Sequence, residues 1–266
     1  MTQTPQIDLE RKLITVASGK GGVGKTVFAI TLSHILARMG RKVLLFDGDI
    51  GLANVDIQLG IMPEHDVGDV INGSISLSSA IFPFDDPVNK DGRLDIVAGK
   101  SGSGALNTLS KERLIGLRAG LTALAGRYDH VILDLAAGIE MSVQTLSGHG
   151  GAILVILTAD PTSLTDAYAF IKLTLMRDPE ADIRVVVNLA DTKRDGERTY
   201  KAIKRACEGF LQFTPPLAGI IHTDERVVES IRRQTAIVSR YPQAQVVADI
   251  KEIARQFPTR AKALAG

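Results

Sequence analysis

The chain has 266 residues, with 31 Lys and Arg against 30 Asp and Glu, so that its formal net charge is +1. This balance argues against a dedicated nucleic-acid binder, and the single Cys207 excludes a disulfide framework. Hydrophobic residues make up 45% of the chain, yet no apolar run is long enough to span a bilayer and no secretory leader is evident, so we expect a folded cytoplasmic protein.

The first predicted element is a phosphate-binding loop between a strand and a helix. Residues 19–26 fit the pattern G-x-x-x-x-G-K-[ST], and they lie between an apolar, β-branched run at 13–17 and a helical pattern at 27–39. Such a loop wraps backbone N–H groups around phosphates at a helix N-terminus. We expect Lys25 to reach the terminal phosphates and the Thr26 hydroxyl to bind Mg²⁺. The predicted nucleotide-binding residues here are Gly21, Gly22, Val23, Gly24, Lys25, Thr26 and Val27.

Further along the chain, strand-like and helix-like segments alternate. The strand-like segments are 12–17, 42–47, 94–98, 130–134, 151–158, 183–189 and 217–221. The helix-like segments are 26–39, 110–125, 140–148, 161–176, 197–211, 224–233 and 244–257. This alternation predicts a single doubly wound, mostly parallel α/β sheet with helices on both faces. We place this domain at residues 12–257, between a flexible tail at 1–11 and a second tail at 258–266, and we expect 60–92 to be irregular.

Three carboxylates follow predicted strands. Asp47 ends the strand at 42–47 and Asp49 follows it two residues later, and Asp134 ends the strand at 130–134. Each alone could be a turn former. Because ligands of open α/β sheets bind beyond the carboxyl ends of the strands, we expect all three to converge on the terminal phosphate and its metal. A phosphoryl-transfer site needs such groups to hold Mg²⁺ and to orient the attacking water.

These motifs resemble those of the MinD/ParA ATPases. The run from Lys20 to Thr26 is similar to their deviant phosphate loop, and the segments at 47–56 and 134–139 are similar to their switch regions. The resemblance implies ATP and Mg²⁺ as cofactors and a homodimer that forms when ATP is bound. It implies that Lys20 touches the partner subunit's ATP and that Asp49 positions the hydrolytic water. It also implies that Asp47 and Asp134 lie on the metal side, together with Thr26.

Finer features resemble the flagellar-number regulators of the FlhG subgroup. They are the segments at 51–60, 161–172 and 231–234. The resemblance implies a role in setting the number and position of flagella, with flagellar switch components, a signal-recognition-type GTPase and a transcription activator as partners. The chain departs from the subgroup at Val27, where many relatives have Thr. We also expect neither their N-terminal GTPase-activating segment nor their C-terminal membrane helix in this chain.

The remaining features leave alternatives open. Asn188 and Asp191 have the spacing of a guanine-reading motif, but Leu189 replaces its lysine, so we predict that Asn188 contacts adenine. The charged segment at 193–208 is interpreted as a solvated helix face, and we expect neither strong DNA binding nor a strong intrinsic membrane anchor. Partners could still recruit the protein to the membrane or the cell pole. A division-site MinD, a cargo- or DNA-positioning ParA, an ATP-dependent ligase and a non-hydrolysing adaptor remain the alternative functions.

Overall fold

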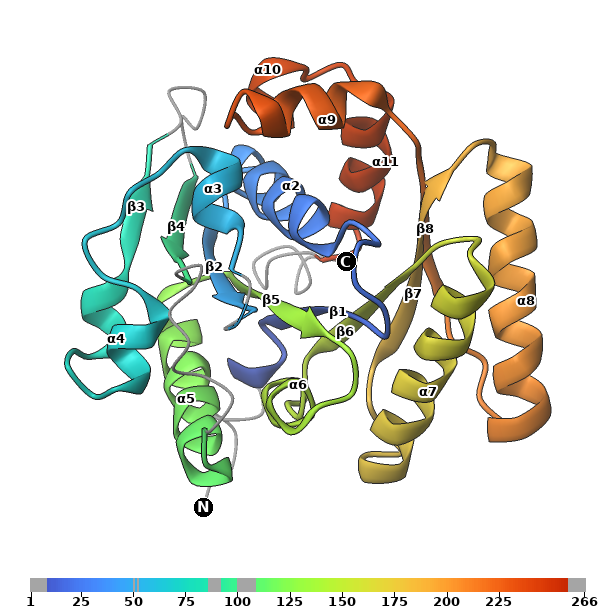
Figure 1. Cartoon of the computed structure of the whole chain (residues 1–266), viewed down its shortest axis with the longest axis horizontal. Coiled ribbons are helices and arrows are strands. Elements are labelled where there is room, and N and C mark those ends of the chain that lie inside the picture. The colour runs from blue at the N-terminus through green and yellow to red at the C-terminus, as the bar shows by residue number, and fades with distance from the viewer. Residues whose placement is uncertain (1–8, 50, 52, 86–91, 100–108, 258–266) are drawn as a thin grey trace, which may run out of the picture.

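The computed structural model describes residues 9–257, apart from 50, 52, 86–91 and 100–108. One eight-stranded sheet runs through this part of the chain in the order β3-β4-β2-β5-β1-β6-β7-β8 (Figure 1). All neighbouring strands are parallel except β3 and β4, which are antiparallel. The strands are β1 (Leu13–Ser18), β2 (Lys42–Gly48), β3 (Phe82–Phe84), β4 (Arg93–Val97), β5 (His130–Ala137), β6 (Ala152–Leu157), β7 (Ile183–Ala190) and β8 (Leu217–His222). The predicted mostly parallel α/β fold is confirmed.

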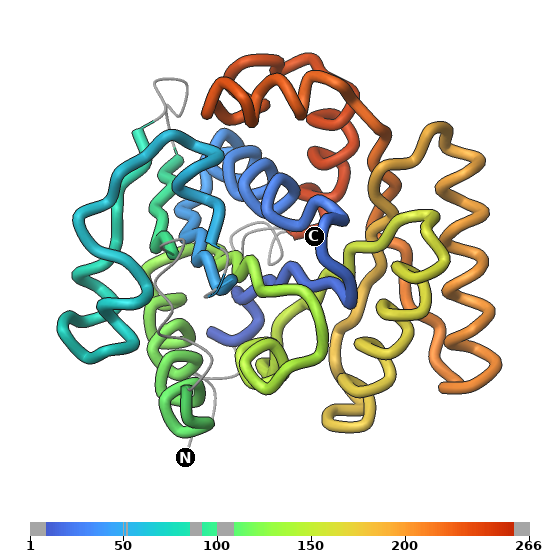
Figure 2. The backbone as a smooth tube through the Cα atoms, viewed as in Figure 1, coloured from blue at the N-terminus to red at the C-terminus, as the bar shows by residue number. Residues whose placement is uncertain are grey.

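Helices cover both faces of this sheet, as the tube in Figure 2 also shows. One face carries α2 (Lys25–Arg38), α3 (Val55–Leu59), α9 (Glu225–Arg232), α10 (Ile237–Arg240) and α11 (Gln245–Ala254). The other face carries α4 (Val67–Ile71), α5 (Lys111–Leu124), α6 (Met141–Leu146), α7 (Pro161–Arg177) and α8 (Lys193–Leu211). Two short 3₁₀ turns, η1 (Leu77–Ala80) and η2 (Ala125–Arg127), lie between these elements.

The two hydrophobic cores are separated by the sheet. Alternate residues of β1 point to opposite faces, so that Ile14 and Val16 belong to the core under α2 while Leu13 and Ala17 belong to the core under α5 and α7. Both sets are fully buried. This explains why the strands read as continuous apolar runs in the sequence.

The segment expected to be irregular holds short regular elements. α4 begins at a capping box in which Asp66 accepts hydrogen bonds from the backbone N–H groups of Gly68 and Asp69, and β3 forms the antiparallel edge. An element of three to five residues is too short for a periodic pattern to reveal. Leu9, placed in the flexible tail from the sequence, is half-buried against the core under α5. Residues 1–8 and 258–266 of the predicted tails lie outside the described residues.

The last helix packs inside the domain. The apolar stripe of α11, which includes Val246, Ile250 and Ile253, is buried in the core that α2 also lines. None of the helices in the described residues is both long and apolar enough to cross a lipid bilayer.

Candidate nucleotide-binding site

The loop that joins β1 to α2 has the backbone of a phosphate cradle. Gly22 and Gly24 have φ angles of 77° and 88°, which L side chains rarely adopt. Gly24 caps α2 in this left-handed conformation, and no side chain caps the helix. The first N–H groups of α2 are therefore available to an anion, whose charge the helix dipole also favours. The backbone thus supports the predicted phosphate-binding role of Gly21 to Val27.

A cavity of about 650 Å³ opens in front of this loop. It is lined by the loop, by the end of β2 and by the segment after β5. Lys25 lines this cavity and is buried. This burial lowers the pKa of its ammonium group, while the carboxylates of Asp134 and Asp49 oppose that effect. Lys25, Asp49 and Asp134 therefore lie close together beside the loop. The expectation that Asp47, Asp49 and Asp134 converge on the terminal phosphate and its metal stays a prediction.

Asp134 has the properties of a group that awaits a cation. Its side chain is buried, and neither carboxylate oxygen has a well-formed hydrogen bond with the described residues. Burial, and then the neighbouring Asp47 carboxylate, raise the pKa of Asp134, against smaller opposing effects of Thr26 and Lys25. A buried carboxylate without a partner is costly, and oxygen ligands suit Mg²⁺. Thr26 and Asp134 therefore fit the predicted metal side of the site.

Asp47 has a different environment. Its side chain is fully buried and accepts hydrogen bonds of 3.2 Å from the backbone N–H groups of Asp49, Asn54 and Val55. These bonds partly offset the burial that raises the pKa of Asp47. In the described chain Asp47 therefore organises the segment that leads into α3. Asp49 is half-buried and lines the cavity, as a water-orienting residue would require.

Lys20 is held within its own chain. Its Nζ lies 2.8 Å from Oδ2 of Asp160 and donates to Oγ1 of Thr162 at 2.5 Å. The Lys20 side chain, and then Thr162, hold the pKa of the Asp160 carboxyl well below its usual range. Both partners belong to the start of α7, and a Cβ atom on Gly19 would lie 2.2 Å from the backbone of Asp166 in the same helix. The phosphate loop is therefore tied closely to α7.

Asn188 reaches the loop from the carboxyl end of β7. Its Nδ2 donates to the backbone carbonyl of Val23 at 2.7 Å, and the side chain is buried. Asn188 therefore supports the loop directly. The predicted contact between Asn188 and the adenine base of a nucleotide would have to use the remaining polar atoms of the same side-chain amide. The next residue, Leu189, has a left-handed φ of 56° and is about half-exposed.

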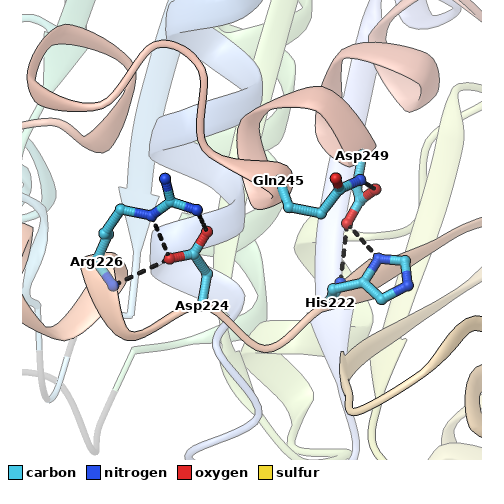
Figure 3. Close-up of polar contacts among 5 residues, drawn as sticks. All are labelled: His222, Asp224, Arg226, Gln245 and Asp249. Atoms are coloured by element: carbon cyan, nitrogen blue, oxygen red, sulfur yellow. Dashed lines mark hydrogen bonds and ion pairs between the residues drawn. The ribbon is translucent and has the colours of Figure 1, made fainter.

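A polar cluster fixes the neighbouring end of β8 (Figure 3). His222 donates through Nδ1 and through its backbone N–H to Oδ2 of Asp249 on α11, and Gln245 donates to Oδ1 of the same carboxylate. Beside it, Arg226 donates to both carboxylate oxygens of Asp224, the capping residue of α9. The segment after β8 is thereby held beside the end of β7 and Asn188.

Several residues at the site were not identified from the sequence. Asn54, Gln58, Glu140 and Ser142 line the cavity. They follow the predicted switch carboxylates along the chain, but their spacing in the sequence does not identify them as residues of a nucleotide-binding site. Asp160 was also missed, because its contact with Lys20 joins residues 140 positions apart.

Comparisons with known proteins agree with this geometry. Residues 14–237 match the CobQ/CobB/MinD/ParA nucleotide binding domain. The antiactivator FleN of Pseudomonas aeruginosa is 32% identical over 245 residues, which cover 92% of this chain and 85% of FleN. The flagellum site-determining protein YlxH of Helicobacter pylori is 29% identical over 192 residues, 72% of this chain and 63% of YlxH.

Among solved structures, the septum site-determining protein MinD of Pyrococcus horikoshii, complexed with Mg-ADP, superposes with a TM-score of 0.75. That match covers 96% of this chain and 97% of MinD at 23% identity, and it supports the fold. The predicted resemblance to the MinD/ParA ATPases and to flagellar regulators is confirmed. The chain therefore belongs to the CobQ/CobB/MinD/ParA nucleotide-binding domain family.

Proposed function

We propose that this protein is an ATP-binding and ATP-hydrolysing switch that dimerises with ATP and regulates the number or position of flagella. The observation that carries the proposal is the convergence of Lys25, Asp49 and Asp134 on a cradle formed by Gly22 and Gly24. The similarity to FleN and YlxH favours a flagellar role over other uses of the same fold.

Each residue has a distinct task in this proposal. The loop backbone and Lys25 bind the phosphates, and Thr26 and Asp134 would hold Mg²⁺, which neutralises the charge on the phosphate oxygens. Asp49 orients the attacking water from the wall of the cavity. Lys20 must leave Asp160 and Thr162 before it can reach a nucleotide in a second subunit. The contact within the chain therefore belongs to the monomer and opposes dimerisation.

The biochemical test combines phosphate release with sedimentation velocity. With ATP and Mg²⁺, we expect slow phosphate release and a shift from monomer to dimer, whereas ADP should leave a monomer. ATP should also displace a labelled nucleotide better than GTP does, because the chain lacks the lysine of a guanine-reading motif at Leu189. Absence of ATP binding would refute the proposed function entirely.

The cellular test distinguishes flagellar from division roles. The structural similarity to MinD keeps division-site selection as the second candidate. Deletion of the gene should change the number or position of flagella per cell, which electron microscopy counts directly. Minicells with normal flagellation would instead favour the division role.

A further inference from the structure

The short helix α3 lies between the nucleotide cavity and α9. α3 and α9 contact each other on the α2 side of the sheet (Figure 1). Gln58 of α3 and Val27 of α2 line the nucleotide cavity, and the same two residues line a second cavity of about 20 Å³ between α2, α3 and α9. The position of α3 therefore decides where one wall of the nucleotide cavity lies.

The two ends of α3 are held by different parts of the chain. At its start, the buried Asp47 carboxylate accepts hydrogen bonds from the backbone N–H groups of Asn54 and Val55. At its end, Nε2 of Gln234 donates to the backbone carbonyl of Ile57 at 3.1 Å. Ile57 lies in the last turn of α3, where carbonyl groups lack the partner that they have within a longer helix. Gln234, which follows α9, is therefore the side chain that ties the end of α3 to the end of α9.

The backbone after α3 also approaches Gln234 closely. Gly60 ends α3 with a φ of 63°, and its N–H lies 3.4 Å from the Ile57 carbonyl that Gln234 also reaches. A Cβ atom on Gly60 would lie 3.1 Å from Cβ of Gln234 and 3.2 Å from its carbonyl oxygen, which is tighter than most Cβ contacts. The ends of the two helices therefore fit each other closely at this point.

Elsewhere the packing between α3 and α9 is less complete. The second cavity is lined on the α9 side by Val227, Ser230 and Ile231. The Ser230 hydroxyl is buried and has no hydrogen-bond partner among the described residues. Atoms that line a gap lose the contacts that close packing would supply. The hydrogen bond of Gln234 therefore has a large share in fixing α3 against α9.

The left-handed backbone of Gln234 does not by itself distinguish this residue. Gln234 has a φ of 50° after α9, and Gln212 has a φ of 54° at the end of α8. Both are exposed, and glycine is the residue most often found at such helix ends. Within the described residues, the Gln212 side chain makes no hydrogen bond, whereas that of Gln234 reaches α3. The contact, and not the conformation, separates the two glutamines.

We propose that Gln234 is a positioning residue for ATP hydrolysis, which fixes α3 and, through α3, the wall of the cavity beside the water-orienting Asp49. Asp49 precedes α3 in the chain and lines the same cavity as Gln58. A small displacement of a positioned group slows a reaction strongly, even when its cause lies away from the reacting atoms. ATP binding is affected less, because the loop backbone and Lys25 bind the phosphates independently of α3. This inference deepens the proposed ATPase function and rests on it.

The experiment compares matched variants of the two glutamines in the full chain. Gln234→Glu keeps the size of the side chain but replaces the donor amide with an acceptor, whereas Gln234→Lys retains an N–H donor. Gln234→Gly removes the side chain, and Gln212→Glu and Gln212→Gly are the controls. Phosphate release gives kcat and KM, isothermal titration gives the affinity for ATP, and amide hydrogen exchange of the nucleotide-free protein reports on α3 directly.

We expect Gln234→Glu and Gln234→Gly to lower kcat by about three- to tenfold, the range that the loss of one such hydrogen bond covers. The affinity for ATP should stay within about twofold of wild type. Gln234→Lys should retain most of the rate, and both Gln212 variants should match wild type. The amides of α3 should exchange faster in Gln234→Glu and not in Gln212→Glu. Glycine adopts left-handed conformations freely, so neither Gly variant should unfold at a lower temperature than wild type.

A wild-type kcat in Gln234→Glu, or an equal loss in Gln212→Glu, would overturn the proposal. So would a rate that Gln234→Lys does not retain, or a loss of ATP affinity as large as the loss in kcat. A wild-type chain that binds and hydrolyses no ATP would instead refute the proposed function. Amide exchange would then still show whether Gln234 holds α3, so that the two failures are distinguishable.

Discussion

The contact between Gly24 and Asn188 allows a quantitative test of the phosphate loop. In Gly24→Ala, the new Cβ would lie 2.5 Å from Nδ2 of Asn188 at a φ of 88°. The left-handed conformation costs about 1–2 kcal/mol for a residue with a Cβ. Displacement of the amide from the Val23 carbonyl costs about 0.5–1.5 kcal/mol more. We therefore expect a loss of about 1.5–3.5 kcal/mol in the free energy of unfolding, which leaves the domain folded.

A double-mutant cycle measured by urea unfolding tests the cause. Gly24→Ala and Asn188→Ala each break the same hydrogen bond, so the double variant should be less destabilised than the sum of the two by about 0.5–1.5 kcal/mol. Gly21→Ala is the matched control, because its Cβ would meet nothing within 4 Å. It should change stability by less than about 0.5 kcal/mol. Additive single effects, or a Gly24→Ala protein as stable as the control, would show that this contact does not hold the loop.

Four further predictions follow from individual side chains. Lys25→Ala should lose ATP binding in isothermal titration, and retained wild-type affinity would remove Lys25 from the phosphate site. Asp49→Ala should still bind ATP but release phosphate about 10²–10⁴-fold more slowly; wild-type turnover would exclude Asp49 as the water-orienting group. Lys20→Ala should bind ATP yet sediment as a monomer, whereas Asp160→Asn should dimerise at a lower protein concentration; a normal Lys20→Ala dimer would contradict the role in trans. Burial lowers the pKa of His149 to about 4, so its contribution to the free energy of unfolding should be complete above the ordinary pKa of about 6.5 and fall as the pH drops towards 4. A ring-proton NMR titration midpoint near 6.5 would show that the site is open to water.

The fold and the loop could be predicted because their signals are local. The sequence of a strand, a glycine-rich loop and a helix around Lys25 needs only neighbouring residues to be recognised. The contacts of Lys20 with Asp160 and of Asn188 with Val23 join segments 140 and 165 residues apart, and no spacing rule predicts them. They depend on the order of strands in the folded sheet.

The structure adds detail to one interpretation that the sequence alone could not supply. Asp47 was expected at the metal side, and that role stays a prediction, but the described structure shows it bonded to backbone N–H groups of the following segment. The backbone course of that segment, which must turn back towards Asp47, cannot be predicted from the sequence. The basic residues Arg194, Arg198, Lys201 and Arg205 of α8 are exposed, as the interpretation of a solvated helix face requires.

The position of β1 in the sheet has a consequence for biosynthesis. β1 starts at Leu13, but it pairs on one side with β5, beginning opposite Val131, and on the other with β6 at Ala152. At about 5–20 residues per second, a ribosome needs roughly 6–24 s to extend the chain from β1 to its first partner. During that interval β1 lacks both neighbouring strands, although β2 and β4 can already pair, so nascent chains that end before β5 should expose the apolar residues of β1. The nucleotide-binding loop is thus synthesised well before the two strands that fix its preceding strand in the sheet.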